Sequence, residues 1–352
     1  MSAQKTAAEG NQPTKTLEPA PTRFGGALGA VKGYLGGAAG RNIGLFVVLI
    51  VIFIIGAVTI GETFLSTANA LTIMRFATVT GVISIGMTFV IILGGIDLSV
   101  GSVLGLSSVV ATMAWVQAPA QAFWPLVIVV ALLVGTLIGA INGFLIAHGK
   151  IVAFMATLAI LIAARGFAEV LSGKHNQILK VPGFKEFLNS SPLGISMSVW
   201  IFALVAVLGW VLLNRTTFGR RTVAIGGNSE AARLAGINVK RHTVYVYALA
   251  GLTAGIAAIL MIGRTGVGTS THGILLELDA IAAVVVGGTL LIGGRGSIVG
   301  SVLGILIFAL LINLFTKYNL DPSIQALAKG FIIIGAVLLQ QRFGARGSTR
   351  TN

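Results

Sequence analysis

The feature that most constrains this chain is a series of long apolar stretches. A membrane-spanning helix needs about 20 consecutive apolar residues. Seven stretches clearly approach that length: 43–61, 72–94, 123–147, 151–171, 195–213, 243–263 and 322–340. Three more are shorter or richer in glycine and serine: 99–117, 278–293 and 297–316. We therefore predict an all-α membrane protein, a polytopic bundle of about ten transmembrane helices.

The composition excludes a water-soluble globule. Charged residues make up 10% of the 352 residues, whereas a soluble domain carries about 25%. Glycine is abundant, with 47 residues, and closely packed membrane helices use small residues at their contacts. The chain has no cysteine, so a disulfide framework and a cysteine-ligated metal site are both impossible. An aqueous enzyme, a nucleic-acid-binding module and a disordered chain are excluded.

The positions of Lys and Arg predict that both termini are cytoplasmic, because basic residues gather in cytoplasmic loops. With ten helices in this N-in, C-in arrangement, sixteen of the 24 basic residues fall inside, five outside and three within apolar segments. We expect a disordered cytoplasmic tail over 1–42, a transmembrane domain over 43–343 and a cytoplasmic tail over 344–352. The net charge of +14 therefore reflects topology rather than affinity for nucleic acid.

An internal repeat links two junctions between apolar segments. Residues 94–105 read GGIDLSVGSVLG and residues 293–304 read GGRGSIVGSVLG, with eight of twelve positions identical. Transporters often contain repeats, and their sites lie at the repeat interface. Convergence of glycine-rich membrane sequence is the alternative. We predict that the glycine pairs Gly94, Gly95 and Gly293, Gly294 line a translocation path or gate.

Asp97 and Ser99 lie in the first of these junctions. An acid beside long apolar runs is costly unless it is paired, hydrated or neutral, and the preceding glycines permit a helix break. One interpretation places Asp97 on the path or gate. The other makes it a cap that stabilises the start of the segment at 99. Both interpretations remain open at this level.

Further charged residues lie in or beside apolar segments. Arg165 and Glu169 have the i,i+4 spacing that predicts an intrahelical ion pair, while Lys329 has no evident partner. Glu277 and Asp279 open the segment 278–293, where acids suit the helix dipole. They equally suit an outer mouth that docks another protein.

The polar loop 214–242 predicts a short cytoplasmic helix. Ser229 is a candidate N-cap, Glu230 an acid in the first turn and Gly236 a C-terminal stop. Such a helix suits docking to a soluble partner, although an ordinary surface helix would show the same sequence pattern. The full sequence has no G-x-x-x-x-G-K-[ST], H-E-x-x-H or G-x-S-x-G motif, so ATP binding by a P-loop and hydrolase chemistry are not expected.

Several of these motifs resemble those of one family. GGIDLSVGS at 94–102, and LDAIAAVVVGGT at 278–289 followed by GGRGS at 293–297, resemble the signatures of sugar ABC-importer permeases of the ribose/xylose/arabinose type. ATL at 156–158 with RG at 165–166 matches as well, and EAA at 230–232 with Gly236 is similar to the family's cytoplasmic coupling loop. The resemblance covers residues 43–343. The chain departs from it only before Phe154, where the usual prolines are missing, and at Ala159, where glycine is usual.

The resemblance implies a multi-pass permease of the bacterial cytoplasmic (inner) membrane that imports a monosaccharide of the pentose or hexose class. It implies a second permease copy or a paralogue, a periplasmic or lipoprotein sugar-binding protein, and a separate ABC ATPase that holds ATP and Mg. The chain itself would be no enzyme and would carry no cofactor, catalytic residue or metal.

The resemblance also implies site residues. Those on the path or gate are Gly94, Gly95, Asp97, Ser99, Thr157, Arg165, Gly293 and Gly294. Those at the ATPase are Ser229, Glu230, Ala231, Ala232, Arg233 and Gly236. Two alternatives remain. A related ABC permease would import branched-chain amino acids or nucleosides, and an ion-coupled secondary transporter would use Asp97 as its ion site.

Overall fold

The computed structural model describes residues 38–332, 334 and 335. The predicted tail 344–352, most of the predicted tail 1–42 and the end of the stretch 322–340 lie outside these residues. The chain from Arg41 onward forms one unit, which is described below.

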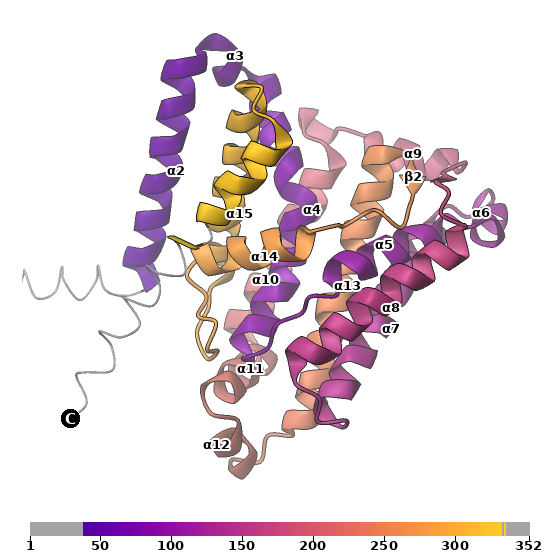
Figure 1. Ribbon diagram of the computed structural model, residues 1–352, viewed down its shortest axis with the longest axis vertical. Helices are drawn as coiled ribbons and strands as arrows, with labels where there is room; N and C mark the ends of the chain where they lie inside the picture. The colour runs from indigo at the N-terminus through magenta and orange to yellow at the C-terminus, as the bar shows by residue number, and fades with distance from the viewer. Residues whose placement is uncertain (1–37, 333, 336–352) are drawn as a thin grey trace, which may run out of the picture. The chain divides into compact units, whose positions relative to one another are not determined.

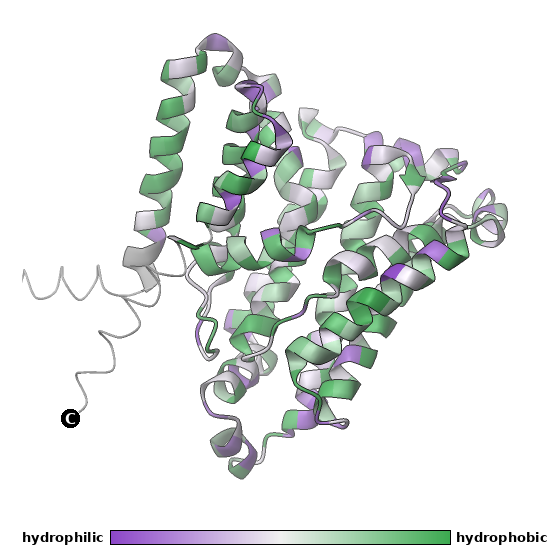
Figure 2. Cartoon of the chain, viewed as in Figure 1, coloured by the Kyte–Doolittle hydropathy of each residue, from purple (hydrophilic) through white to green (hydrophobic). Residues whose placement is uncertain are grey.

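Helices dominate the described residues, as Figure 1 shows, and apolar residues cover most of them (Figure 2). Among the described residues, seven helices are long and apolar enough to cross a membrane. They are α2 (Ala38–Ile60), α4 (Thr67–Ile92), α7 (Pro125–Ala147), α8 (Ala153–Ser172), α10 (Met197–Arg215), α13 (Val239–Thr265) and α15 (Ile298–Lys317). The prediction of an all-α protein with several membrane-length helices is confirmed.

Two predicted segments are broken. The segment 99–117 forms α5 (Val100–Ala111) and α6 (Ala114–Ala120), which meet at 59° and make an eighth candidate span if counted as one. Thr112 ends α5, with its hydroxyl bonded back to the Ser108 carbonyl at 2.8 Å. The segment 278–293 forms only α14 (Leu276–Val286), because Gly288 follows with a positive φ of 86° that stops a helix.

The long helices differ widely in how much of each is buried inside the bundle. Most of α4 is buried, whereas α2 is almost entirely exposed. Helices α7 and α13 touch backbone to backbone, since a Cβ on Gly139 would lie 2.9 Å from the Cα of Gly251, and one on Gly135 would lie 3.0 Å from the Cα of Gly255. Small residues four apart let membrane helices approach this closely.

Short elements cap the two ends of the bundle. At one end lie α11 (Thr217–Gly227) and α12 (Ser229–Leu234) (Figure 1). At the other end lie α9 (Pro182–Asn189), β1 (Gln177–Ile178) and β2 (Val267–Gly268). The strands β1 and β2 pair in antiparallel fashion, with Gln177 opposite Gly268. We call these the α12 end and the sheet end. The remaining short elements are α3 (Glu62–Leu65) and the 3₁₀ turn η1 (Pro192–Gly194).

Candidate functional site

The first junction, residues 93–99, connects α4 to α5 through the predicted helix break. Gly94 has a φ of +90°. The Gly94 amide donates to the Ile91 carbonyl at 2.9 Å and the Gly95 amide to the Val90 carbonyl at 3.0 Å. This pair of bonds is the Schellman motif, which ends helices at a left-handed glycine. The glycine pair therefore terminates α4 inside the bundle.

Asp97 lies at the centre of a buried polar network in this junction. Its side chain is 1% exposed, and its Oδ1 accepts from the Ser99 amide at 2.8 Å and the Ser99 hydroxyl at 2.6 Å. Asn142 of α7 donates to the Ser99 hydroxyl at 2.8 Å, and Thr157 of α8 donates to the Ile96 carbonyl at 3.3 Å. Asp97 thus organises the turn before α5, and the structure brings three predicted residues together.

Two buried polar residues in or beside this network were missed by the sequence reasoning. Asn142 is fully buried, and its Oδ1 makes no hydrogen bond in the described part of the chain. The hydroxyl of Tyr247, on α13, is likewise unpartnered there and lies against Gly95. Asn142 could have been identified from the sequence, because its side-chain amide lies in the apolar stretch 123–147 and a buried polar group needs hydrogen-bond partners.

The second junction, residues 287–297, connects α14 to α15 and lies against the first. Gly293 and Gly294 have φ values of +88° and +75°. The Gly294 amide donates to the Ile92 carbonyl, the last residue of α4, at 2.8 Å. A Cβ on Gly293 would lie 3.0 Å from the Cα of Gly94. The two glycine pairs of the repeated sequence therefore meet in space.

Arg165 lies in a different place, where it holds the loop 266–275 against α8. Its guanidinium donates to the carbonyl of His272 at 2.8 Å and to that of Ser270. The His272 ring in turn bonds to the hydroxyl of Ser108 on α5 at 3.2 Å. We call Arg165, His272 and Ser108 the α8 clamp. It fixes irregular backbone within the bundle by satisfying its carbonyl groups, as buried backbone requires.

The predicted ion pair between Arg165 and Glu169 is wrong. The carbonyls of the loop occupy the guanidinium, and the carboxylate of Glu169 lies 3.9 Å from Lys174 instead. Tertiary contacts have overridden the i,i+4 spacing.

The two acids Glu277 and Asp279, at the start of α14, are both partly or fully withdrawn from the surface. Glu277 is 8% exposed. Asp279 forms an ion pair with Lys329 at 2.9 Å, with side chains 21% and 25% exposed. This contact supplies the partner that the sequence did not reveal for Lys329, and it connects α14 to the helix over 322–332. Docking of another protein near these two acids stays a prediction.

Helix α12 has the predicted length, but its N-cap is Asn228 rather than Ser229. The Asn228 side chain accepts from the amides of Glu230 at 3.1 Å and Ala231 at 2.9 Å, because Asn228 is extended and Ser229 is already helical. Gly236 has a φ of +83°, which confirms the predicted stop.

The surface of α12 carries an ion pair and an exposed apolar side chain. The guanidinium of Arg233 bonds to the Glu230 carboxylate at 2.6 and 3.0 Å, and this contact lowers the pKa of Glu230. Ala232 faces inward, whereas Leu234 is 74% exposed. An isolated exposed leucine is unremarkable, but on a capped helix it adds an apolar contact point that the sequence reasoning missed.

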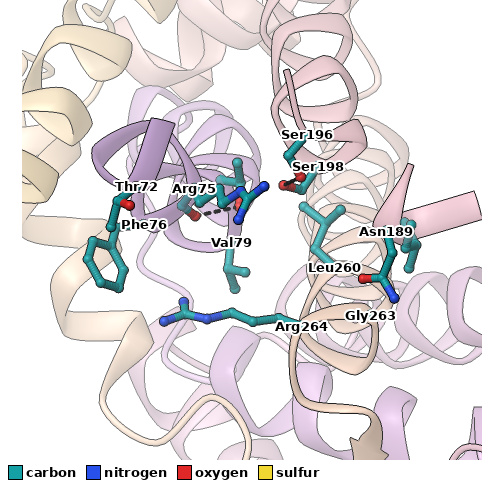
Figure 3. Close-up of a pocket in the computed structure, with 12 residues that line it drawn as sticks. Thr72, Arg75, Phe76, Val79, Asn189, Ser196, Ser198, Leu260, Gly263 and Arg264 are labelled. Carbon is teal, nitrogen blue, oxygen red and sulfur yellow. Dashed lines mark hydrogen bonds between the residues drawn. The ribbon is translucent and has the colours of Figure 1, made fainter. Parts of the chain in front are cut away.

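A cavity of about 360 Å³ opens toward the sheet end, between α4, α9, α10 and α13 (Figure 3). Its polar lining includes Arg75, Thr78, Ser196, Ser198 and Arg264. The guanidinium of Arg264 lies 5.1 Å from the centre of the Phe76 ring. The cavity therefore offers hydrogen-bond donors suited to a polar or anionic solute.

Comparisons with known proteins all find permease proteins of transport systems. Residues 69–339 match the family model described as "Branched-chain amino acid transport system / permease component". The chain is 41% identical to the ribose import permease protein RbsC of Bacillus subtilis, over 87% of this chain and 93% of that protein. It is 38% identical to RbsC of Haemophilus influenzae, over 86% and 93%. It is 33% identical to the xylose transport system permease protein XylH of Escherichia coli, over 87% and 93%.

No solved structure matches the chain. The family match nevertheless extends from α4 into the last helix and includes both glycine junctions, the α8 clamp and α12. This chain therefore belongs to the family of transport-system permease components that this model describes.

Proposed function

We propose that this chain is the pore-forming permease subunit of an ATP-driven ABC importer for a monosaccharide of the pentose or hexose class. The observation that carries the proposal is the extent of the similarity to the ribose permeases, which covers 93% of each of those proteins. The family model takes its description from amino acid transport. Ribose and xylose permeases at 33–41% identity favour a sugar.

The α12 end supports coupling to a separate ATPase. Helix α12 is short, capped at both ends and projects an ion pair and Leu234 from the bundle. A capped helix of this kind is a rigid contact for a soluble partner, since its backbone groups are satisfied within the chain. Glu230, Arg233 and Leu234 would contact the ATPase, with Ser229, Ala231, Ala232 and Gly236 shaping the helix. ATP and Mg would reside on the ATPase.

The glycine junctions would form the inner gate of the path. Asp97, Ser99 and Thr157 meet in the first junction, and the repeat brings the second junction against it. Arg165 would hold the loop 266–275 in place above them. Alternating access then requires the junctions to separate when α12 moves.

We also propose ten spans with both termini in the cytoplasm, in the bacterial inner membrane. This orientation puts the α12 end inside, toward the ATPase, and the sheet end outside, toward a sugar-binding protein. Because the chain has no cysteine, single substitutions test it directly. Ser229→Cys should react with an impermeant maleimide only in inverted vesicles, and Lys180→Cys only in right-side-out cells. The reverse labelling would overturn the orientation.

The test of function is reconstitution in proteoliposomes with the cognate ATPase and binding protein. We expect uptake of radiolabelled ribose or xylose that requires ATP and all three components. Radiolabelled leucine is the control substrate, and its uptake in place of the sugars would instead support the amino acid alternative. Uptake by the permease alone, driven by an ion gradient, would support a secondary transporter.

A further inference from the structure

The last turn of α11 touches the backbones of both junctions at once. A Cβ added at Gly226 would overlap the Ile92 carbonyl oxygen. The same Cβ would lie 2.6 Å from the Gly294 amide nitrogen. These are backbone atoms of the two junction-forming segments, and they are bonded to each other at 2.8 Å. Gly226 therefore lies on the hydrogen bond that joins the first junction to the second.

The contact continues on either side of Gly226. A Cβ on Gly293 would lie 2.9 Å from the Gly226 carbonyl oxygen, and one on Gly294 would lie 2.9 Å from the Cα of Gly227. Protein interiors are packed as densely as crystals and transmit displacement. With no side chain between the three backbones, little can absorb a movement of α11.

Helix α11 is also anchored along its length. The ring of Phe218 lies 5.9 Å from that of Phe89 on α4 and 4.7 Å from that of His242 on α13. The Thr222 hydroxyl is 2.8 Å from the His242 ring nitrogen. These contacts hold the first two turns of α11 against α4 and α13.

A single residue joins α11 to α12. Asn228 is the C-cap of α11, with its amide bonded to the Ala224 carbonyl at 3.1 Å. Its side chain is also the N-cap of α12. No flexible linker separates the two helices, so displacement of α12 is passed to Gly226 through two residues.

We propose that Gly226 is a positioning residue that transmits movement of α12 to the hydrogen bond between the two junctions. The inference rests on the proposed function, because it requires α12 to be moved by an ATPase. It identifies the end of α11 as the transmitting contact and a backbone bond, Gly294 amide to Ile92 carbonyl, as its target. A side chain at position 226 would hold the junctions apart or displace α11.

The chain supplies a matched control for Gly226→Ala. Gly227 is the next residue of the same helix, and a Cβ there meets no heavy atom within 4 Å. Both substitutions raise the helix propensity of α11 equally, so a difference between them reports the contact alone. We expect Gly226→Ala to lower sugar transported per ATP hydrolysed about ten-fold, the scale of overpacking a backbone contact. ATPase recovery with the permease should remain near wild type, whereas the melting temperature of Gly226→Ala should fall because the added Cβ meets the backbone at Ile92. All values for Gly227→Ala should remain near wild type.

Equal transport per ATP in Gly226→Ala and Gly227→Ala, beside an active wild type, would overturn the inference and leave the proposed function standing. A wild-type complex that imports neither ribose nor xylose would instead count against the function.

A second measurement does not depend on the variant folding. Amide hydrogen exchange of the wild-type complex should show altered protection at Gly294 when the ATPase is trapped with ATP and vanadate. Peptides that cover the loop 266–275 serve as the reference. Unchanged protection at Gly294 in a complex that transports would also overturn the inference.

Discussion

The glycine junctions and the α8 clamp both hold irregular backbone inside the bundle, but they do so with different atoms. At the junctions, the Gly294 amide meets the Ile92 carbonyl directly. At the clamp, the side chain of Arg165 reaches across to the carbonyl of His272. A contact between backbone atoms contains no side chain that a substitution could shorten. A side-chain contact can instead be weakened gradually by substitution with shorter or less polar residues. Substitutions should therefore have all-or-none effects at the junctions and graded effects at the clamp.

The largest effect is expected for Gly294→Ala. Its φ of +75° and a Cβ only 2.9 Å from the Cα of Gly227 add backbone strain to overpacking, together about 4 kcal/mol of lost stability. Thermal melting in detergent measures it. Gly173→Ala is the control, since its φ is +59° but the nearest heavy atom is 3.7 Å from the Cβ, so it should lose only about 1 kcal/mol. Equal losses of stability in Gly294→Ala and Gly173→Ala would show that the backbone contact at Gly294 does not contribute.

Arg165→Ala should come next, with a loss of about 3 kcal/mol, because the carbonyls of Ser270 and His272 are left without their donor. Arg165→Lys should lose about 1 kcal/mol, since an ammonium retains the charge and part of the hydrogen bonding. Melting temperatures of the three proteins test the order. If lysine is as damaging as alanine, the clamp is not graded and the comparison fails.

Lys329→Met should lower stability by about 2 kcal/mol, because it leaves the carboxylate of Asp279 unpaired in a poorly hydrated place. Combining it with Asp279→Asn should restore most of the loss. Recovery of stability by a second substitution is possible only where side chains make the contact, so no such double variant exists for Gly294. A double variant no more stable than Lys329→Met would contradict this.

The smallest effect is expected on the surface of α12. Arg233 lowers the pKa of the Glu230 carboxyl from its ordinary value of 4.5. The ion pair thus contributes fully above that pH, and the contribution is lost as the pH falls through the lowered pKa. Both side chains are exposed, so Arg233→Ala should shift the melting temperature by less than about 1 °C at neutral pH. When melting temperature is measured against pH, the difference between wild type and Arg233→Ala should be smaller below pH 4.5 than above it. A difference that grows as the pH falls would contradict this direction.

The apolar stretches and the glycine pairs predicted much of this architecture. The helix at 72–94 was predicted within five residues of its ends, since span length and helix-stopping glycines are local properties. Gly94 and Gly293 were singled out by a repeat, and the structure places them together. The count of ten spans and the side of the membrane remain predictions.

The contacts between distant segments could not be predicted in the same way. The partners of Arg165 and Lys329 lie 107 and 50 residues away, and nothing in local spacing indicates them. Asn228 displaced Ser229 as the N-cap because either side chain can cap a helix and only the backbone conformation decides. Glycines with negative φ, such as Gly226, carry no local signal of a close approach.

The close contact between α7 and α13 has a consequence for biosynthesis. Residues 148–238 separate the two helices, so at a synthesis rate of roughly 5–20 residues per second α7 spends roughly 5–20 s in the membrane before α13 exists. During that interval the glycine face of α7 can meet only lipid or another helix. The rate of synthesis, rather than the packing of the helices, therefore sets the earliest moment at which α7 and α13 can pack together.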